Sequence, residues 1–281
     1  MAITSFSAVS AALGPSLRRA EQNRYVYVKF DQGVPGAIQE VDGTAAVVTD
    51  AGINTFLYGN QQFMYFVEQA FAGTAPQVLD AAGGGLKLVL DAADNDGLFL
   101  SLPWCTSAGG GTLKTAGPGK FESRTDGFFI RVKLEVTTVA NADEIAVGVR
   151  KIVAFDTSAV TSTATNPDFA CLNIANGQVN IVTALNQGTA STTDTTQDVA
   201  NAGTITFEVR VSESGFVKFL INGVAPTVDV SSFQFDSGDD LMPYIAVVVD
   251  ATAADPVVII HEWESGLLTE RGLDGINDLV N

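Results

Sequence analysis

A regular alternation of apolar and polar residues over positions 203–223 constrains the fold of this chain more than any other feature. In residues 205–211 every second side chain is apolar, which is the pattern of a strand with one buried face. Residues 212–215 (Ser-Glu-Ser-Gly) favour a turn, and the alternation resumes over residues 217–221 before Asn222-Gly223 ends it. The segment therefore predicts a long antiparallel hairpin that is buried on one side.

Further strands are predicted at regular intervals. The cleanest is residues 128–136, in which apolar positions alternate with Arg131, Lys133 and Glu135. Other predicted strands are residues 25–30, 44–50, 86–90, 98–102, 145–149, 152–155, 171–174, 179–182, 244–249 and 257–263. Asn176-Gly177 favours a tight primed turn between two of them. This spacing predicts an all-β fold, an antiparallel two-sheet sandwich.

Composition and charge limit the classes of partner. The chain has 281 residues, 46% of them hydrophobic and only 17% charged, which is typical of a globular protein rather than a disordered one. Its net charge of −17 repels nucleic acid and anionic membranes, so we expect neither as a partner. Residues 1–13 lack the basic start of a signal peptide, and the apolar runs are too short to span a bilayer. We expect a soluble product made in the cytoplasm.

The chain divides into four predicted parts. Residues 1–24 form an N-terminal arm, residues 25–85 an N-terminal extension and linker, residues 86–265 the sandwich, and residues 266–281 a C-terminal tail. The linker proper is the Gly-rich stretch 73–85, and the Ser- and Thr-rich stretches 156–168 and 188–198 are predicted loops.

Residues 61–71 are the one strong candidate for a helix. Apolar residues recur there at helical spacing, which predicts a short helix with one apolar face, and a buried strand remains the alternative. An aromatic stripe of this kind is typical of a core or an interface. The candidate interface residues are Phe63, Phe66 and Phe71, together with Arg18 and Arg19 of the arm.

Residues suited to catalysis are few. His261 is the sole histidine, and no Gly-x-Ser-x-Gly motif accompanies it, so a structural role at a sheet edge is expected. Glu262 and Glu264 lie two apart in a predicted strand and so face the same side, about 6.8 Å apart along the backbone. Paired carboxylates are what glycoside hydrolysis needs, but such a pair also arises by chance in a chain with 32 acidic residues. We predict no catalytic residue.

Metal and cofactor signals are also weak. Residues 91–97 (DAADNDG) resemble a calcium loop, but the EF-hand pattern fails because Ala92 and Pro103 fall on its first and twelfth positions. These residues and the acidic run 236–240 are predicted to be Asx-rich turns, with a non-EF ion site as the alternative. No metal or cofactor is expected. Cys105 and Cys171 are expected to be buried, and the sequence leaves open whether they pair.

Together, several strand segments resemble the concanavalin A-like (laminin-G-like) jelly rolls. They are FIRVKLEV (129–136), DEIAVGV (143–149), ITFEVRV…GFVKFLING (205–223) and MPYIA (242–246), and the resemblance covers about residues 86–265. Glucanases of this fold carry three alternating acids on one strand. Here Glu262 and Glu264 are followed by Ser265-Gly266, so the third acid is missing. The resemblance thus implies a jelly-roll sandwich without an enzymatic signature.

A jelly roll that follows an arm of small residues, in an acidic chain rich in Ala, Thr and Gly, is similar to virion proteins of tailed bacteriophages. This resemblance implies a non-enzymatic structural protein, most simply a capsid decoration (cement) protein. It would be made in the host cytoplasm, lie on the capsid exterior, contact the major capsid protein or other virion subunits, and form a homo-oligomer.

Two alternatives remain open. The first is a carbohydrate-binding, lectin-like adhesion module of a fibre or tail, with a surface glycan bound near Trp104 or residues 236–240. The second is a glycoside hydrolase that uses Glu262 and Glu264.

Overall fold

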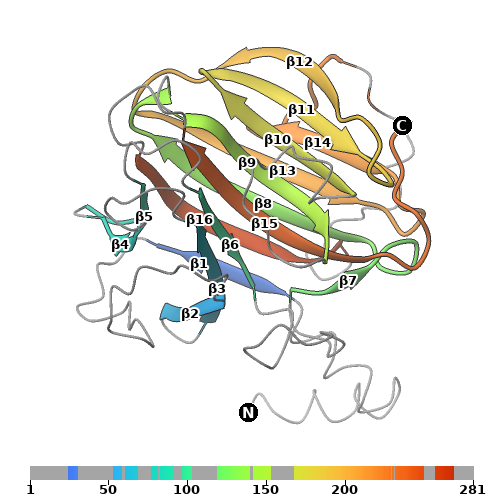
Figure 1. Cartoon of the computed structure of the whole chain (residues 1–281), viewed down its shortest axis with the longest axis horizontal. Coiled ribbons are helices and arrows are strands. Elements are labelled where there is room, and N and C mark those ends of the chain that lie inside the picture. Colours follow the sequence, from blue (N-terminus) through green and yellow to red (C-terminus); the bar gives the residue numbers. More distant parts are fainter. Residues whose placement is uncertain are drawn as a thin grey trace, which may run out of the picture.

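Two antiparallel sheets, stacked face to face, make up the computed structural model of the chain (Figure 1). The structure describes residues 25–30, 53–58, 61–68, 77–81, 83–90, 97–102, 119–139, 142–152, 168–228, 230, 232–249 and 257–268. Within these ranges the chain forms sixteen strands, and none of it is a helix long and apolar enough to cross a membrane. The predicted all-β, two-sheet antiparallel sandwich is confirmed.

The first sheet has seven strands. Their order is β14-β13-β8-β16-β5-β4, and β1 pairs with β16 beside β5. The strands are β1 (Val26–Lys29), β4 (Gln77–Asp80), β5 (Leu86–Val89), β8 (Phe128–Val136), β13 (Gly203–Val211), β14 (Val217–Ile221) and β16 (Val257–Leu267).

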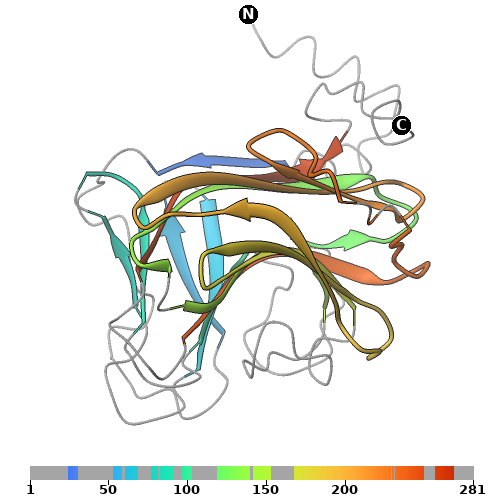
Figure 2. The same ribbon diagram turned by 90° about the horizontal axis from the view of Figure 1, so that it is seen from above.

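The second sheet has nine strands, in the order β12-β11-β10-β9-β15-β6-β3-β2, with β7 paired to one end of β15. The strands are β2 (Ile53–Tyr58), β3 (Gln61–Glu68), β6 (Gly97–Ser101), β7 (Phe121–Glu122), β9 (Ala142–Lys151), β10 (Phe169–Ala175), β11 (Gln178–Ala184), β12 (Ser191–Asp198) and β15 (Asp240–Val249). Figure 2 shows the two sheets as curved, stacked layers.

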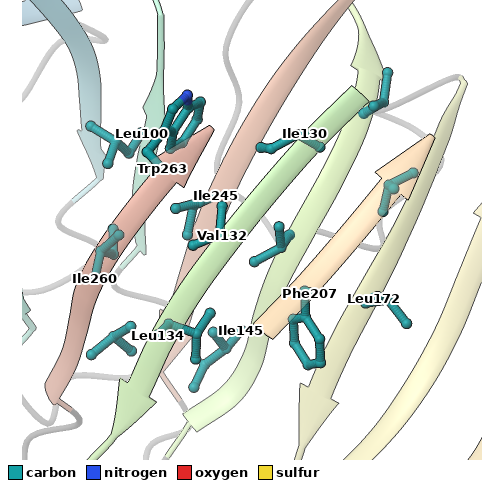
Figure 3. Close-up of a cluster of buried hydrophobic side chains, with 14 of the residues drawn as sticks. Leu100, Ile130, Val132, Leu134, Ile145, Leu172, Phe207, Ile245, Ile260 and Trp263 are labelled. Atoms are coloured by element: carbon teal, nitrogen blue, oxygen red, sulfur yellow. The ribbon is translucent and has the colours of Figure 1, made fainter. Parts of the chain in front are cut away.

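The main core lies between the sheets, as Figure 3 shows. Its centre is built from alternate residues of both sheets, all with 0% exposure: Ile130, Val132, Leu134, Phe207, Ile260 and Trp263 from the seven-stranded sheet, and Leu100, Ile145, Leu172 and Ile245 from the nine-stranded sheet. Burial of each of these side chains contributes about 1.5–3 kcal/mol. The period-2 patterning seen in the sequence is therefore the patterning of this core.

The two predicted turns have the expected backbone. Asn176 and Gly177, between β10 and β11, have φ values of 49° and 86°, and Asn222 and Gly223, after β14, have 52° and 82°. Positive φ at both central residues is the requirement of a type I′ turn, one of the two primed turns. The Asn222 side chain also accepts a hydrogen bond from the Thr206 backbone N–H at 2.9 Å, which ties the turn to β13.

The helix predicted over residues 61–71 is wrong where the structure describes it. Residues 61–68 form β3, which pairs with β2 and β6. Phe63 faces the main core, while Met64 points the other way and is also buried. Because Phe63 and Met64 are buried on opposite faces, the sequence shows no period-2 alternation there, and the aromatic spacing resembled that of a helix. Residues 69–71 lie outside the described residues.

The predicted loop over residues 188–198 is also wrong in part, because residues 191–198 form β12. This strand lies at the edge of its sheet and pairs with β11, and its side chains are mostly exposed. An exposed strand needs no apolar alternation, so its Ser- and Thr-rich sequence resembled a loop.

Strands of the predicted extension, residues 25–85, are part of the two sheets. The β1, β3 and β4 strands pair with β16, β6 and β5, respectively. The predicted linker 73–85 contains β4. The arm, the strand predicted over residues 44–50, and the tail beyond residue 268 lie outside the described residues.

We predict that Phe63→Ala lowers the free energy of unfolding by about 3–5 kcal/mol, because it leaves a cavity in the core. The Phe63 ring is fully buried, with its centroid 5.7 Å from that of Trp263 and 5.8 Å from that of Phe30. Urea titration measures the change. Tyr27→Ala is the control, since Tyr27 is 51% exposed, and its expected effect is within about 0.5 kcal/mol. Unchanged stability in Phe63→Ala, with altered self-association, would instead support an interface role.

Candidate functional site

The predicted carboxylate pair lies on the outer face of the seven-stranded sheet. Glu262 and Glu264 share the guanidinium of Arg131 on β8, whose Nη1 is 3.2 Å from Glu262 Oε2 and 3.5 Å from Glu264 Oε2. The Tyr25 hydroxyl donates to Glu264 Oε1 at 2.9 Å, and the Glu264 side chain is only 8% exposed. The two carboxylates do face the same side as predicted, and they join β8, β16 and the residue before β1.

The sole histidine lies beside this network. The β16–β8 register shifts between Ile260 and Glu262, which places His261 in a β-bulge. Its Nε2 is 3.3 Å from Glu135 Oε2 on β8. The partner is a carboxylate rather than a serine. The expected position at a sheet edge is wrong, because β16 pairs with β8 on one side and with β1 and β5 on the other.

A second polar group closes one end of the sandwich. Lys151, the last residue of β9, places Nζ 3.0 Å from Asp168 Oδ2 and 2.5 Å from Asp239 Oδ1. Asp168 precedes β10 and Asp239 precedes β15, so three strand ends meet in this Lys151 triad. Burial raises the pKa of Asp239, and the Lys151 ammonium opposes that shift. Burial lowers the pKa of Lys151, but its contacts with Asp239 and Asp168 outweigh this effect and the net pKa is raised.

The acidic run 236–240 is part of this end of the molecule. Asp236 accepts a hydrogen bond from the Asn186 amide at 2.8 Å, and Asp240 pairs with Lys120 at 2.7 Å. Across the described part of the chain, no set of three or more Asp, Glu, His or Cys side chains is placed to hold a metal ion. In this run, each contacting carboxylate faces a protein group: Asp239 and Asp240 face lysine ammonium groups, and Asp236 faces a side-chain amide. The loop at residues 91–96 lies outside the described residues.

A second apolar cluster lies on the outer face of the nine-stranded sheet, and we call it the outer cluster. Its members are Phe99, Ala146, Phe169, Cys171, Val182, Ala184, Tyr244, Ala246 and Val248. Each is at most 4% exposed. The nine-stranded sheet is therefore apolar on both faces, and the sequence shows this as continuous apolar runs in β10 and β15.

Aromatic and cationic groups are stacked within this cluster. The Phe99 and Tyr244 rings are stacked with centroids 6.3 Å apart, and the Arg150 guanidinium carbon lies 5.6 Å from the Phe99 centroid. Arg150 is only 1% exposed. Such an Arg–aromatic contact is stabilising when it is desolvated. Phe99 from β6, Tyr244 from β15 and Arg150 from β9 thus pack together as one aromatic and cationic group.

Gly148 on β9 allows the side chains of Tyr244 and Cys171 to approach each other within the outer cluster. In the strand register Tyr244 lies opposite Gly148, and Gly148 lies opposite Cys171. A Cβ on Gly148 would come within 2.5 Å of the Cys171 Cβ. Because Gly148 has no side chain, Tyr244 and Cys171 become neighbours across it. Burial raises the pKa of Tyr244 well above its usual value, and Cys171 adds to that shift.

The polar atoms of this face without a hydrogen-bond partner among the described residues include two that belong to uncharged side chains. They are the Tyr244 hydroxyl and Asn173 Oδ1, in side chains 1% and 4% exposed. The neighbour of the Tyr244 hydroxyl is the Cys171 thiol, a weak hydrogen-bonding group. An unsatisfied buried polar group costs about 1–3 kcal/mol. A ligand that supplied the missing partners would recover that free energy.

The predicted interface residues are not brought together by the described structure. Phe63 lies in the main core, and the side chain of Phe66 lies outside the described residues, as do Phe71, Arg18 and Arg19. Trp263 is a core residue, and Trp104 and Cys105 are not described. Cys171 is a free, buried thiol. Tyr244, Asn173 and Arg150 were not predicted as site residues, because no motif marks them.

We predict that Cys171 resists alkylation by iodoacetamide at pH 8 in the folded protein. Burial raises the pKa of its thiol to about 12, which lowers the thiolate population about a thousandfold relative to a free cysteine. Peptide mapping separates Cys171 from Cys105, and labelling in urea provides the reference rate. Rapid labelling of Cys171 in the folded state would contradict the prediction and would show that the outer cluster opens readily.

No protein-family model matches the chain, and no curated protein sequence matches it. Solved structures do match. The Emp47p carbohydrate recognition domain has 13% identity over 82% of this chain and 94% of that one, with a TM-score of 0.46. A Shewanella oneidensis MR-1 protein of unknown function has 13% identity over 86% of each chain, also with a TM-score of 0.46. Alginate lyase A1-II′, of polysaccharide lyase family 7, has 11% identity over 68% of this chain and 82% of that one, with a TM-score of 0.42.

Proposed function

We propose that this chain is a non-catalytic carbohydrate-binding module, used for adhesion in a virion fibre or tail, and that the outer face of the nine-stranded sheet holds the glycan. The observation that carries the proposal is a pair of buried polar atoms, the Tyr244 hydroxyl and Asn173 Oδ1, that lack a strong hydrogen-bond partner among the described residues. They lie on the sheet face that also carries the stacked Phe99 and Tyr244 rings.

This combination matches the chemistry of a sugar ring. A pyranose has an apolar C–H face, which packs on aromatic rings, and hydroxyl groups at its edge, which need donors and acceptors. Phe99 and Tyr244 supply aromatic surface. The Tyr244 hydroxyl and the side-chain amide oxygen of Asn173 supply hydrogen-bonding atoms.

Access to this face is part of the proposal. The outer cluster is buried within the chain, so a glycan binds only when the face becomes exposed. A binding-competent state that is only fractionally populated lowers the apparent affinity by that fraction. Association should therefore be slow, and ligand binding should change amide hydrogen exchange in β10 and β15.

The arrangement of the acids supports a binding role rather than hydrolysis. Glu262 and Glu264 are both engaged by Arg131, and Tyr25 also donates to Glu264. They lie on the seven-stranded sheet, whereas the proposed glycan face belongs to the other sheet. The carboxylate pair therefore has a structural explanation.

We predict that Tyr244→Phe has two effects of opposite sign. Removing an unsatisfied hydroxyl should stabilise the unliganded protein by about 1 kcal/mol, while glycan binding should weaken at least about tenfold. A glycan array identifies a ligand, and calorimetry and urea unfolding of the variant measure the two effects. The control is Tyr27→Phe, which removes an exposed hydroxyl on the other sheet. An array without any binding, or a Tyr244→Phe variant that binds normally, would overturn the proposal.

Capsid decoration is the second candidate function, and the edge strand β1 favours it. Tyr25 and Tyr27 are 37% and 51% exposed there, and the strand follows directly after the segment predicted to be an arm. Exposed aromatic residues are enriched at protein interfaces.

Mass spectrometry of purified particles from the source tests this candidate. A copy number in simple ratio to the major shell protein would favour decoration, and a handful of copies would favour a fibre or tail. Absence from particles would exclude both virion roles. Glycan binding itself would then be decided by the glycan array alone.

A further inference from the structure

The Lys151 triad has the parts needed to form a covalent bond. An amine, a carboxyl group and a second carboxyl group converge at one point, because Lys151 Nζ contacts both Asp168 Oδ2 and Asp239 Oδ1. Asp168 is 1% exposed and Asp239 is 8% exposed, so both carboxyl groups are shielded from water. The backbone already joins the same two strands, since the Lys151 N–H donates to the Asp168 carbonyl at 2.8 Å.

We propose that Lys151 and Asp168 form an intramolecular isopeptide bond, with Asp239 as the group that moves the protons. The bond would link the end of β9 to the start of β10 and close the chain between them into a ring. It would be a permanent modification of the folded chain and is independent of the proposed glycan function.

The reaction balances without any co-reactant. A proton first passes from the Lys151 ammonium to a carboxylate, giving a neutral amine beside the Asp168 carboxylic acid. The Nζ lone pair attacks Asp168 Cγ, and an N–C bond forms. The C–Oδ2 bond then breaks, and Oδ2 leaves as water with the acid proton and one amine proton, which Asp239 carries across. One amide and one water are the products.

Two features of the surroundings favour this step. The Asn186 backbone N–H donates to Asp168 Oδ1 at 2.5 Å, so it is placed to stabilise the negative charge that develops on that oxygen during attack. Asp239 Oδ2 has no hydrogen-bond partner among the described residues and is buried, which favours its protonated form. The Lys151 triad therefore contains a nucleophile (Lys151), a polarised carbonyl (Asp168) and a proton carrier (Asp239).

A neighbouring ion pair provides the matched control. Lys120 and Asp240 are 2.7 Å apart at the same end of the sandwich, but the Asp240 side chain is 42% exposed. Water stabilises that pair as ions. Lys120 should therefore keep its free amine.

The test is the intact mass of the purified full-length protein, followed by tryptic mapping. The expected mass is one water, about 18 Da, below the sequence mass. Trypsin should fail to cut after an acylated Lys151, and because Arg210 is the next basic residue, a 151–210 peptide lacking one water should appear. Lys151→Arg and Asp239→Asn should restore the full mass, whereas Lys120→Arg should still lack the water.

Other outcomes decide against the bond. A full mass, with normal cleavage after Lys151, would show that the triad is only an ion pair and would overturn the proposal. A missing water that persists in Lys151→Arg would also overturn it, because succinimide formation at an Asp-Gly sequence such as Asp126-Gly127 gives the same mass change.

Discussion

Burial of alternate side chains between the two sheets is the constraint on which the rest of the structure depends. The β8 and β13 strands alternate over residues 130–136 and 205–211, so one face of each enters the main core and the other carries charged or polar groups. Trp263 on β16 completes this layer and contacts Phe63 across the sandwich. The charged network on the outer face and the Lys151 triad at the rim take their positions from this register, because a slip of one residue would exchange the two faces.

Sequence patterning predicts a strand well where one face is buried and the other is solvated. The bounds of β8 and β14 agree with the pattern residue for residue, and polar residues hold most of the outward positions of β8. Patterning fails at the two extremes. The β3 strand buries Phe63 and Met64 on opposite faces and resembled a helix, whereas β12 is mostly exposed and resembled a loop. In both strands the missing information is what the neighbouring elements cover, and only the tertiary structure supplies it.

Prediction of the candidate sites was limited for a related reason. The Glu262–Glu264 pair was found because two carboxylates at i and i+2 are visible in the sequence, yet Arg131, which engages both, is about 130 residues away. Tyr244, Gly148 and Cys171 become neighbours through two strand pairings, and the Lys151 triad through three strand ends. No local spacing carries such information, so these sites follow from sheet topology rather than from motifs.

The pairing of β1 with β16 has a consequence for how the protein is made. Tyr25 and Glu264 are 239 positions apart, and β1 has its only recorded strand partner, among the described residues, in β16. During synthesis Tyr25 therefore leaves the ribosome 239 residues before Glu264. The β1–β16 edge of the seven-stranded sheet cannot form until β16 has been made, and contacts of such long sequence separation form slowly. A nascent chain of this protein must keep β1 apart from its partner strand while the strands between them are synthesised.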